Sequence, residues 1–211
     1  MRLLIPVPSW LRSLLERDWD TLRRFYREAL IAYLSGAVIG LVAVPLRYRL
    51  YTDVEYLFYA LRDVNSYPLL QLMGGWDALQ RLSFALRTNL ISEPLLLILP
   101  GILMLSYPLL ILKFLLTGLI ATPILLSHPI LLIAFTPIIP LEAAGFTIAA
   151  LAGGHLGRAI FKPRSLYGEA RRAAALKKAL KELSLYYIPM LLILTLSSLL
   201  EVGLSLIFDI F

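Results

Sequence analysis

The chain has no cysteine and only two histidines, His128 and His155. The lack of cysteine excludes disulfides, thiolate metal sites and cysteine nucleophiles, and two histidines are too few for a histidine-rich metal centre. The hydrolase signatures GxSxG and HExxH are also missing from the sequence. We therefore expect a protein that is not an enzyme, with no catalytic residue, no metal and no cofactor.

Charged residues are scarce as well, at 16% of the 211 residues, whereas 59% are hydrophobic. Average soluble domains are about a quarter charged, so the composition indicates a membrane protein. The net charge of +6 comes with no aromatic–basic pattern of the kind that binds nucleic acid, and we expect no nucleic-acid partner. The missing cysteine and the few Asn and Gln residues are typical of a heat-adapted, thermophile source.

Five long apolar segments are expected to cross the bilayer, because a span needs about 20 apolar residues. They cover residues 29–46, 90–105, 109–126, 129–157 and 186–211. Pro137 and Pro140 break the fourth segment, which is either one kinked span or a re-entrant hairpin hinged at these prolines. The predicted fold is an all-α, polytopic transmembrane protein of about five spans with a proline-broken fourth segment.

Arginine and lysine residues predict the orientation of these spans. Basic residues gather in segments 1–28 and 162–185, whereas the loop 47–88 has arginines offset by acids. We expect both basic segments and the N-terminus to be cytoplasmic, the loop to lie outside, and the chain to be a multi-pass protein of the cell (plasma) membrane. Apolar residues at three- and four-residue spacing predict that both basic segments are interfacial amphipathic helices, which bind an anionic leaflet or a partner. The predicted division is a cytoplasmic segment 1–28, a membrane domain 29–161, a cytoplasmic helix 162–185 and a C-terminal transmembrane helix 186–211.

Small residues at four-residue spacing indicate where helices pack closely. One helix face of the fourth segment has a ladder of four small residues, Gly145, Ala149, Gly153 and Gly157, and the first span has the pair Gly36 and Gly40. Such residues let two backbones approach each other in a membrane. We expect these positions to form helix contacts, and the ladder to support a homodimer.

Four of the polar residues inside the predicted spans are singled out as intramembrane polar sites: Lys113, Glu142, Ser198 and Glu201. Burying such groups in lipid is costly, so they should face protein or water. At 1.5 Å per residue, Glu142 and Glu201 both lie roughly 22 Å from the cytoplasmic boundary. Glu142 follows Pro140 closely, and it either caps the start of a helix, handles an ion or proton, or recognises a partner.

Three side chains, Lys113 among them, have expected positions near the membrane surface. Lys113 either snorkels to the cytoplasmic interface or pairs with Glu142. His155 is expected to reach the cytoplasmic headgroup layer, and His128 to lie in a short outer turn.

The stretch from Pro137 to Gly145, PIIPLEAAG, resembles the signature of the stage II sporulation protein M family. That family reads Pro-His-Gly-x-x-Glu before a helix rich in small residues. Pro137 and Glu142 keep this spacing, but Ile138 and Ile139 replace the histidine and glycine, so no role of that histidine carries over. The resemblance spans residues 16–160. It implies an integral membrane protein without established catalysis that works in a membrane-remodelling complex, with relatives that accompany MoxR-type ATPases.

Two functions are therefore expected. The first is a non-enzymatic integral membrane protein that scaffolds or shapes a membrane complex, with the lipid bilayer, a second copy of itself and complex partners as its contacts. The alternative is an ion- or proton-coupled transporter or channel that uses Glu142 and Glu201 beside the helix break.

Overall fold

The computed structural model describes residues 9–43, 78–127, 136–169 and 171–207. Every regular element in these ranges is helical, which confirms the all-α class. The elements are α1 (Ser9–Ala43), α4 (Ala78–Arg87), η2 (Thr88–Ser92), α5 (Glu93–Ile98), η3 (Leu99–Leu103), α6 (Ser106–Ser127), α8 (Ile138–Phe161), α9 (Pro163–Tyr167) and α10 (Arg172–Ile207). Most of the predicted outer loop, His128 and residues 129–135 of the fourth segment lie outside the described residues.

Four helical stretches are long and apolar enough to cross a membrane: Glu16–Val42, Leu82–Leu103, Ile138–Phe161 and Arg172–Leu204. A shorter apolar helix covers Ser106–Leu119. These stretches match the chain's apolar composition and support its assignment as a membrane protein.

Two helices are longer than the expected spans. α1 continues through residue 28 to Ala43, and α10 continues through residue 185 to Ile207. The sequence has no glycine or proline from Ser9 to Ser35, so nothing stops the basic segment from extending the helix of the first span. The predicted boundaries at 28/29 and 185/186 are therefore not helix ends.

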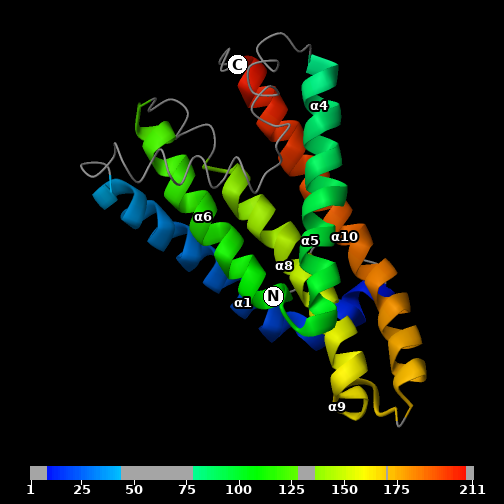
Figure 1. Cartoon of the computed structure of the whole chain (residues 1–211). Coiled ribbons are helices and arrows are strands. Elements are labelled where there is room, and N and C mark those ends of the chain that lie inside the picture. The colour runs from blue at the N-terminus through cyan, green and yellow to red at the C-terminus, as the bar shows by residue number, and fades with distance from the viewer. Residues whose placement is uncertain (1–8, 44–77, 128–135, 170, 208–211) are drawn as a thin grey trace.

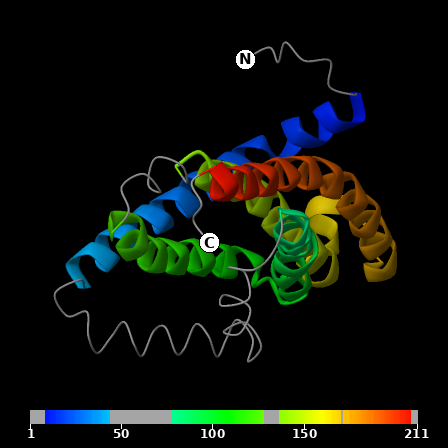
Figure 2. The same cartoon turned by 90° about the horizontal axis from the view of Figure 1, so that it is seen from above.

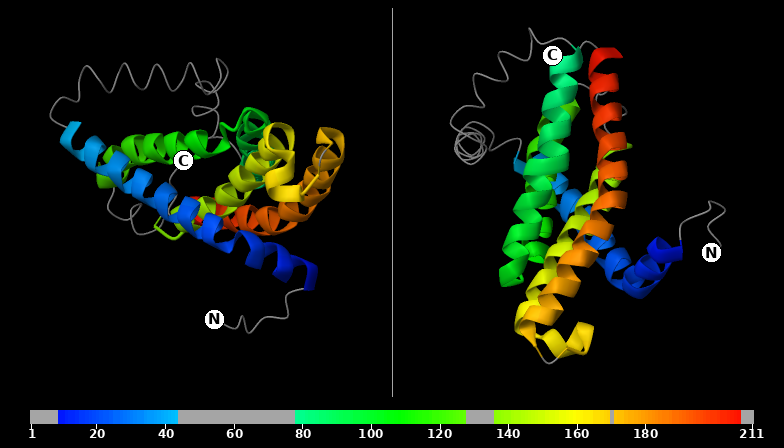
Figure 3. Two further views of the ribbon diagram at one scale, coloured as in Figure 1. Left: turned by 90° about the horizontal axis from the view of Figure 1, so that it is seen from below. Right: turned by 90° about the vertical axis from the view of Figure 1, so that its right-hand side faces the viewer.

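The helices pack in pairs around α8. α1 packs along α6, α10 packs along α8, and α5 with η3 covers another side of α8. Figure 1 shows α1 crossing the bundle at a slant, with α8 behind α5 and beside α10. The same arrangement is seen from above in Figure 2 and from two further sides in Figure 3. α9 and the η3–α6 turn lie at the same end of the bundle, which we call the α9 end.

Two prolines explain the irregular rod formed by α4, η2, α5 and η3. Pro94 has no N–H to donate to the carbonyl of Leu90, and the π-turn η2 lies there. The Tyr187 hydroxyl of α10 donates to this Leu90 carbonyl at 2.7 Å. Farther along, the 3-10 turn η3 contains Pro100 near its start, and the Ser106 hydroxyl donates to the Leu97 carbonyl at 2.6 Å. Side chains of other helices thus satisfy carbonyls that the broken helix ladder frees.

Glycines bring α1 and α6 into backbone contact. A Cβ atom at Gly36 would lie 2.0 Å from the Leu115 carbonyl oxygen, and one at Gly118 would lie 2.0 Å from the Tyr33 carbonyl oxygen. At Gly40 the same atom would lie 2.7 Å from the oxygen of Leu119. No side chain fits at these positions unless the two helices separate.

The small-residue ladder of α8 packs against helices of the same chain. A Cβ atom at Gly153 would lie 2.3 Å from Ser106 Oγ, and one at Gly157 would lie 2.3 Å from the Gly101 carbonyl oxygen. At Gly145 it would lie 2.5 Å from the Leu194 side chain of α10, and Ala149 is 1% exposed. The ladder is thus covered internally, so the homodimer expected through it has no free surface there.

Candidate functional site

A cluster of charged and phenolic side chains joins four helices near the α9 end. We call it the charged cluster, and its members are Arg17 and Asp18 of α1, His155 of α8, Tyr167 of α9, and Glu182 and Tyr186 of α10. The members lie up to 169 residues apart in the chain. The bundle therefore brings together groups that are remote in sequence.

His155 and Tyr186 are the most buried members of the cluster, each at 1% exposed. For His155, the flanking groups are two carboxylates. Its Nε2 atom lies 3.4 Å from Asp18 Oδ1, and its Nδ1 atom lies 3.5 Å from Glu182 Oε2. The ring also meets the Tyr186 ring edge-on, with centroids 5.4 Å apart. The imidazole is thus held between two carboxylates from different helices, at ion-pair distances longer than good hydrogen bonds.

Arg17 binds both carboxylates of the cluster. Its two terminal nitrogens donate to Glu182 at 2.7 and 2.9 Å, and its Nε donates to Asp18 at 2.9 Å. The forked contact to Glu182 is the geometry in which arginine pairs most strongly with a carboxylate. With His155 protonated, the two cations and two carboxylates of the cluster balance to zero.

The two tyrosines complete the cluster. The Tyr167 hydroxyl donates to Glu182 at 2.9 Å, and the Tyr186 hydroxyl donates to Asp18. Burial, together with the hydrogen bond to Glu182, raises the pKa of Tyr167. This phenol therefore keeps its proton, and acts as a donor, at neutral pH.

The prediction that His155 reaches the headgroup layer was wrong. That prediction used only the distance of His155 along α8. It did not include the acids of α1 and α10 that flank the imidazole. A signal for those acids does exist in the sequence. Asp18 lies four and seven residues before the buried Leu22 and Phe25, on the face that packs inward. Glu182 likewise falls between Ala179 and Tyr186, which are both buried.

A second polar group lies within the bundle, around Lys113 of α6. We call it the lysine group; it comprises Lys113, Glu93, Glu142 and Glu201. Lys113 Nζ lies 2.7 Å from Glu93 Oε2 and 4.3 Å from the centroid of the Phe146 ring. Glu142 is close enough to Lys113, Glu201 and Glu93 to interact with all three electrostatically. Lys113 therefore forms a partly buried ion pair with Glu93 of α5.

Ser198 of α10 has a polar partner in the same part of the bundle. It is fully buried, and its hydroxyl accepts a hydrogen bond from the Asn89 side chain at 3.1 Å. Asn89 belongs to the π-turn η2. This bond fixes the irregular part of the rod to α10.

The capping role expected for Glu142 was wrong. α8 begins at Ile138 with Pro137 as its N-cap, and neither an acid in the first turn nor a side-chain cap is found there. Pro140 falls in that first turn, where the missing N–H needs no partner. The two prolines thus lie at the start of α8, which then runs unbroken for 24 residues to Phe161. This is roughly 36 Å at 1.5 Å per residue, enough to span a bilayer without the preceding segment.

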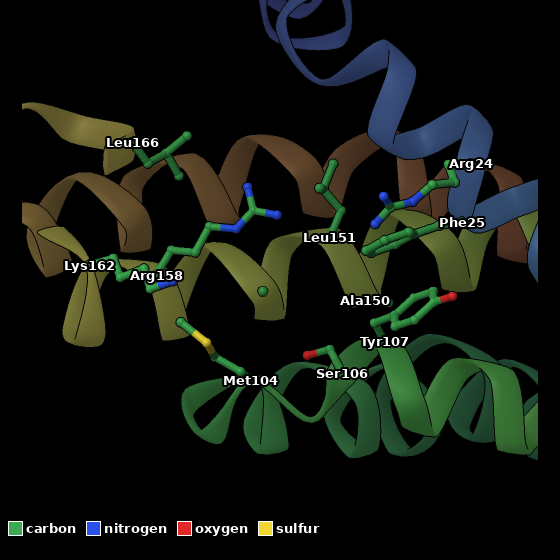
Figure 4. A pocket seen from close by; sticks show the side chains of 11 residues that line it. Arg24, Phe25, Met104, Ser106, Tyr107, Ala150, Leu151, Arg158, Lys162 and Leu166 are labelled. Atoms are coloured by element: carbon green, nitrogen blue, oxygen red, sulfur yellow. The ribbon is translucent and has the colours of Figure 1, made fainter. Parts of the chain in front are cut away.

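A cavity of about 560 Å³ lies at the α9 end, among α1, the η3–α6 turn, α8 and α9. We call it the basic pocket. Figure 4 shows its lining, which combines three cationic side chains with aromatic and aliphatic ones. The lining residues are Arg24, Phe25, Met104, Ser106, Tyr107, Ala150, Leu151, Gly154, Arg158, Lys162 and Leu166. Neither Glu142 nor Glu201 belongs to this lining.

Comparisons with protein-family models, curated proteins and solved structures found no match. Among the described residues, no group of three His, Asp or Glu side chains has an arrangement that could hold a metal ion. The sites available for a functional argument are therefore the charged cluster, the lysine group and the basic pocket.

Proposed function

We propose that this chain is a non-enzymatic integral membrane protein that scaffolds or shapes a membrane complex. The observation that carries the proposal is the charged cluster, in which Arg17 and His155 meet Asp18 and Glu182 across three long helices. These charged side chains pair with one another, so they hold the helices in one arrangement and do not line a transport pathway. A fixed arrangement of helices is what a scaffold needs.

The proposed topology has about five spans, an N-terminus in the cytoplasm and a plasma-membrane location. The α9 end is then cytoplasmic. Basic side chains support this orientation, because Arg158, Lys162 and Arg164 all lie at the α9 end and Lys177 and Lys178 lie near the start of α10. The exposed apolar face of α1, including Leu34 and Val38, would contact lipid.

The resemblance to the stage II sporulation protein M family supports the same proposal. It rests on Pro137, Glu142 and the small residues that follow them. The partners it implies are other proteins of a membrane complex or a MoxR-type ATPase. A homodimer also stays part of the proposal, through a surface other than the ladder of α8.

A transporter or channel is the second candidate, and the lysine group favours it. There Glu142 lies within electrostatic range of both Glu93 and Glu201, and Lys113 is paired with Glu93. A proton on one of these acids, or a bound cation, would ease their mutual repulsion. Groups that exchange protons or cations inside a membrane are the basis of coupled transport.

Flux measurements separate the two candidates. The full chain is reconstituted in sealed vesicles, and uptake of protons and alkali cations is followed under an imposed gradient. A scaffold gives the flux of empty vesicles, in the wild type and in Glu142→Gln alike. Flux in the wild type that is lost in Glu142→Gln would replace the scaffold by the transporter.

A second measurement tests the scaffold directly. Native membranes from the source cells are solubilised gently and separated by native electrophoresis, beside the purified chain. We expect the chain to migrate in a larger assembly in the native sample than when it is pure. Identical migration of the two samples would count against a membrane complex.

A further inference from the structure

The basic pocket takes no part in the charged cluster or the lysine group, and its lining points to a ligand. Arg24, Arg158 and Lys162 supply three cationic groups to one cavity. No carboxylate belongs to the lining. Glu28 lies beside it and accepts a hydrogen bond from the hydroxyl of the lining residue Tyr107. A cavity with this lining attracts an anion.

Two of these cations, Arg24 and Arg158, have no acidic partner in the part of the chain that the structure describes. Within the described residues, no ion pair involves Arg24 or Arg158. Arg24 instead lies over the Phe25 ring, 5.6 Å from its centroid. In Figure 4 the side chains of Arg24 and Arg158 extend toward each other from opposite ends of the cavity. Elsewhere in the bundle, by contrast, Arg17 and Lys113 are matched with carboxylates.

Most of the remaining lining is apolar, apart from the hydroxyls of Ser106 and Tyr107. Phe25, Met104, Leu151 and Leu166 line the same cavity as the cations. The floor is open at Gly154, where a Cβ atom would have no neighbour within 4 Å. A ligand that fits these walls has an anionic group joined to a hydrocarbon part.

The position of the cavity selects the kind of ligand. It lies at the α9 end, where α8 ends and η3 turns into α6. In the proposed topology this end of the spanning helices meets the cytoplasmic lipid headgroups. Apolar side chains beside it are exposed, among them Leu103, Leu105 and Phe161. A lipid could therefore enter from the bilayer without crossing water. A volume of about 560 Å³ is in the usual range for small-molecule sites.

We propose that the basic pocket binds one anionic glycerophospholipid. Its phosphate lies among Arg24, Arg158 and Lys162, and the glycerol and first part of the acyl chains lie against Met104 and Leu151. Guanidinium groups suit this task because they bind phosphate oxygens in a bidentate manner. The inference goes beyond the proposed function and holds equally for a scaffold or a transporter.

Native mass spectrometry of the purified full chain in detergent micelles tests this proposal. Phosphatidylglycerol is titrated in, with phosphatidylcholine of the same acyl chains as the comparison. We expect one phosphatidylglycerol molecule to stay bound under conditions that remove phosphatidylcholine. Arg158→Gln should weaken this binding about tenfold, because it removes a charge-assisted contact to phosphate. Lys177→Gln, at an exposed position of α10, removes the same charge elsewhere and should bind as the wild type does.

A second variant blocks the cavity without removing charge. Gly154→Leu puts a side chain into the open floor and should abolish phosphatidylglycerol retention while the thermal unfolding midpoint holds. Gly203→Leu is the matched control, since a Cβ atom there also has no neighbour within 4 Å. Equal retention in Gly154→Leu and wild type would overturn the proposal, as would equal retention of the two lipids. Displacement of the lipid by an equal concentration of glycerol phosphate would also overturn it, in favour of a site for soluble phosphates.

Discussion

The charged cluster and the lysine group use the same kinds of side chain in one bundle, but they are built differently. In the charged cluster, Asp18 and Glu182 each have at least two partners. When His155 is protonated, its charge and that of Arg17 balance the two carboxylates. In the lysine group, Lys113 is within ion-pair distance of Glu93, while Glu142 and Glu201 interact at longer range. The first arrangement joins helices, and the second leaves charge that a proton or cation can balance.

This contrast predicts that mutations in the charged cluster affect folding most. Asp18→Ala should lower the free energy of unfolding by about 3 kcal/mol or more, because it leaves buried His155 and the Tyr186 hydroxyl without their partner. Denaturant or thermal unfolding in detergent measures the change. Asp20→Ala, which removes an exposed acid of the same helix, is the control. If the two variants lose equal stability, the cluster does not hold the helices together.

Neighbouring glycines of α8 offer a comparison of packed and open positions. Gly153→Leu should cost about 1–3 kcal/mol, because its Cβ atom would lie 2.3 Å from Ser106 Oγ and 2.9 Å from Ile98 Cα. Gly154→Leu should keep or raise stability, since leucine favours helix and its Cβ meets nothing within 4 Å. Thermal unfolding of both variants is the measurement. Similar unfolding midpoints would show that α5 and η3 are not closely packed against the small-residue ladder of α8.

A smaller effect is expected where a side chain of α10 binds the carbonyl that Pro94 leaves free in the irregular rod. Tyr187→Phe removes the hydrogen bond to the Leu90 carbonyl and should cost about 1 kcal/mol. Pro94→Ala provides the missing N–H, so in that background Tyr187→Phe should cost less. The coupling is read from unfolding free energies of the two single variants and the double variant. Additive losses would mean that Tyr187 does not substitute for the proline N–H.

The sequence predicted the parts of the fold that depend on local pattern. Apolar runs and glycine spacing were enough for the all-α class and for the close contacts of Gly36, Gly40 and Gly153. Pro137 and Pro140 were predicted to break the fourth segment, and α8 begins between them, at Ile138. These features depend on residues that are neighbours in the chain.

The charged cluster could not be predicted in the same way. Asp18, His155 and Glu182 lie on three helices, and each alone looks like an ordinary residue of an amphipathic or interfacial segment. Dividing α1 at residue 28 and α10 at residue 185 moved both acids out of the membrane domain in the prediction. Lys113 was assigned to the interface for a related reason, because its partner Glu93 lies 20 residues away on a different rod.

The smallest effect on stability is expected for Glu142→Gln, and this variant tests the second half of the contrast. α8 starts at Ile138 without help from Glu142. Removing its charge weakens an attraction to Lys113 but also relieves repulsion from Glu93 and Glu201. The net change in unfolding free energy should stay within about 0.5 kcal/mol. Glu182→Gln is the control, because there the same substitution breaks a forked contact with Arg17, and we expect it to lose clearly more stability. If Glu142→Gln loses more stability than Glu182→Gln, then the lysine group holds the bundle together. The contrast between the charged cluster and the lysine group would then be wrong.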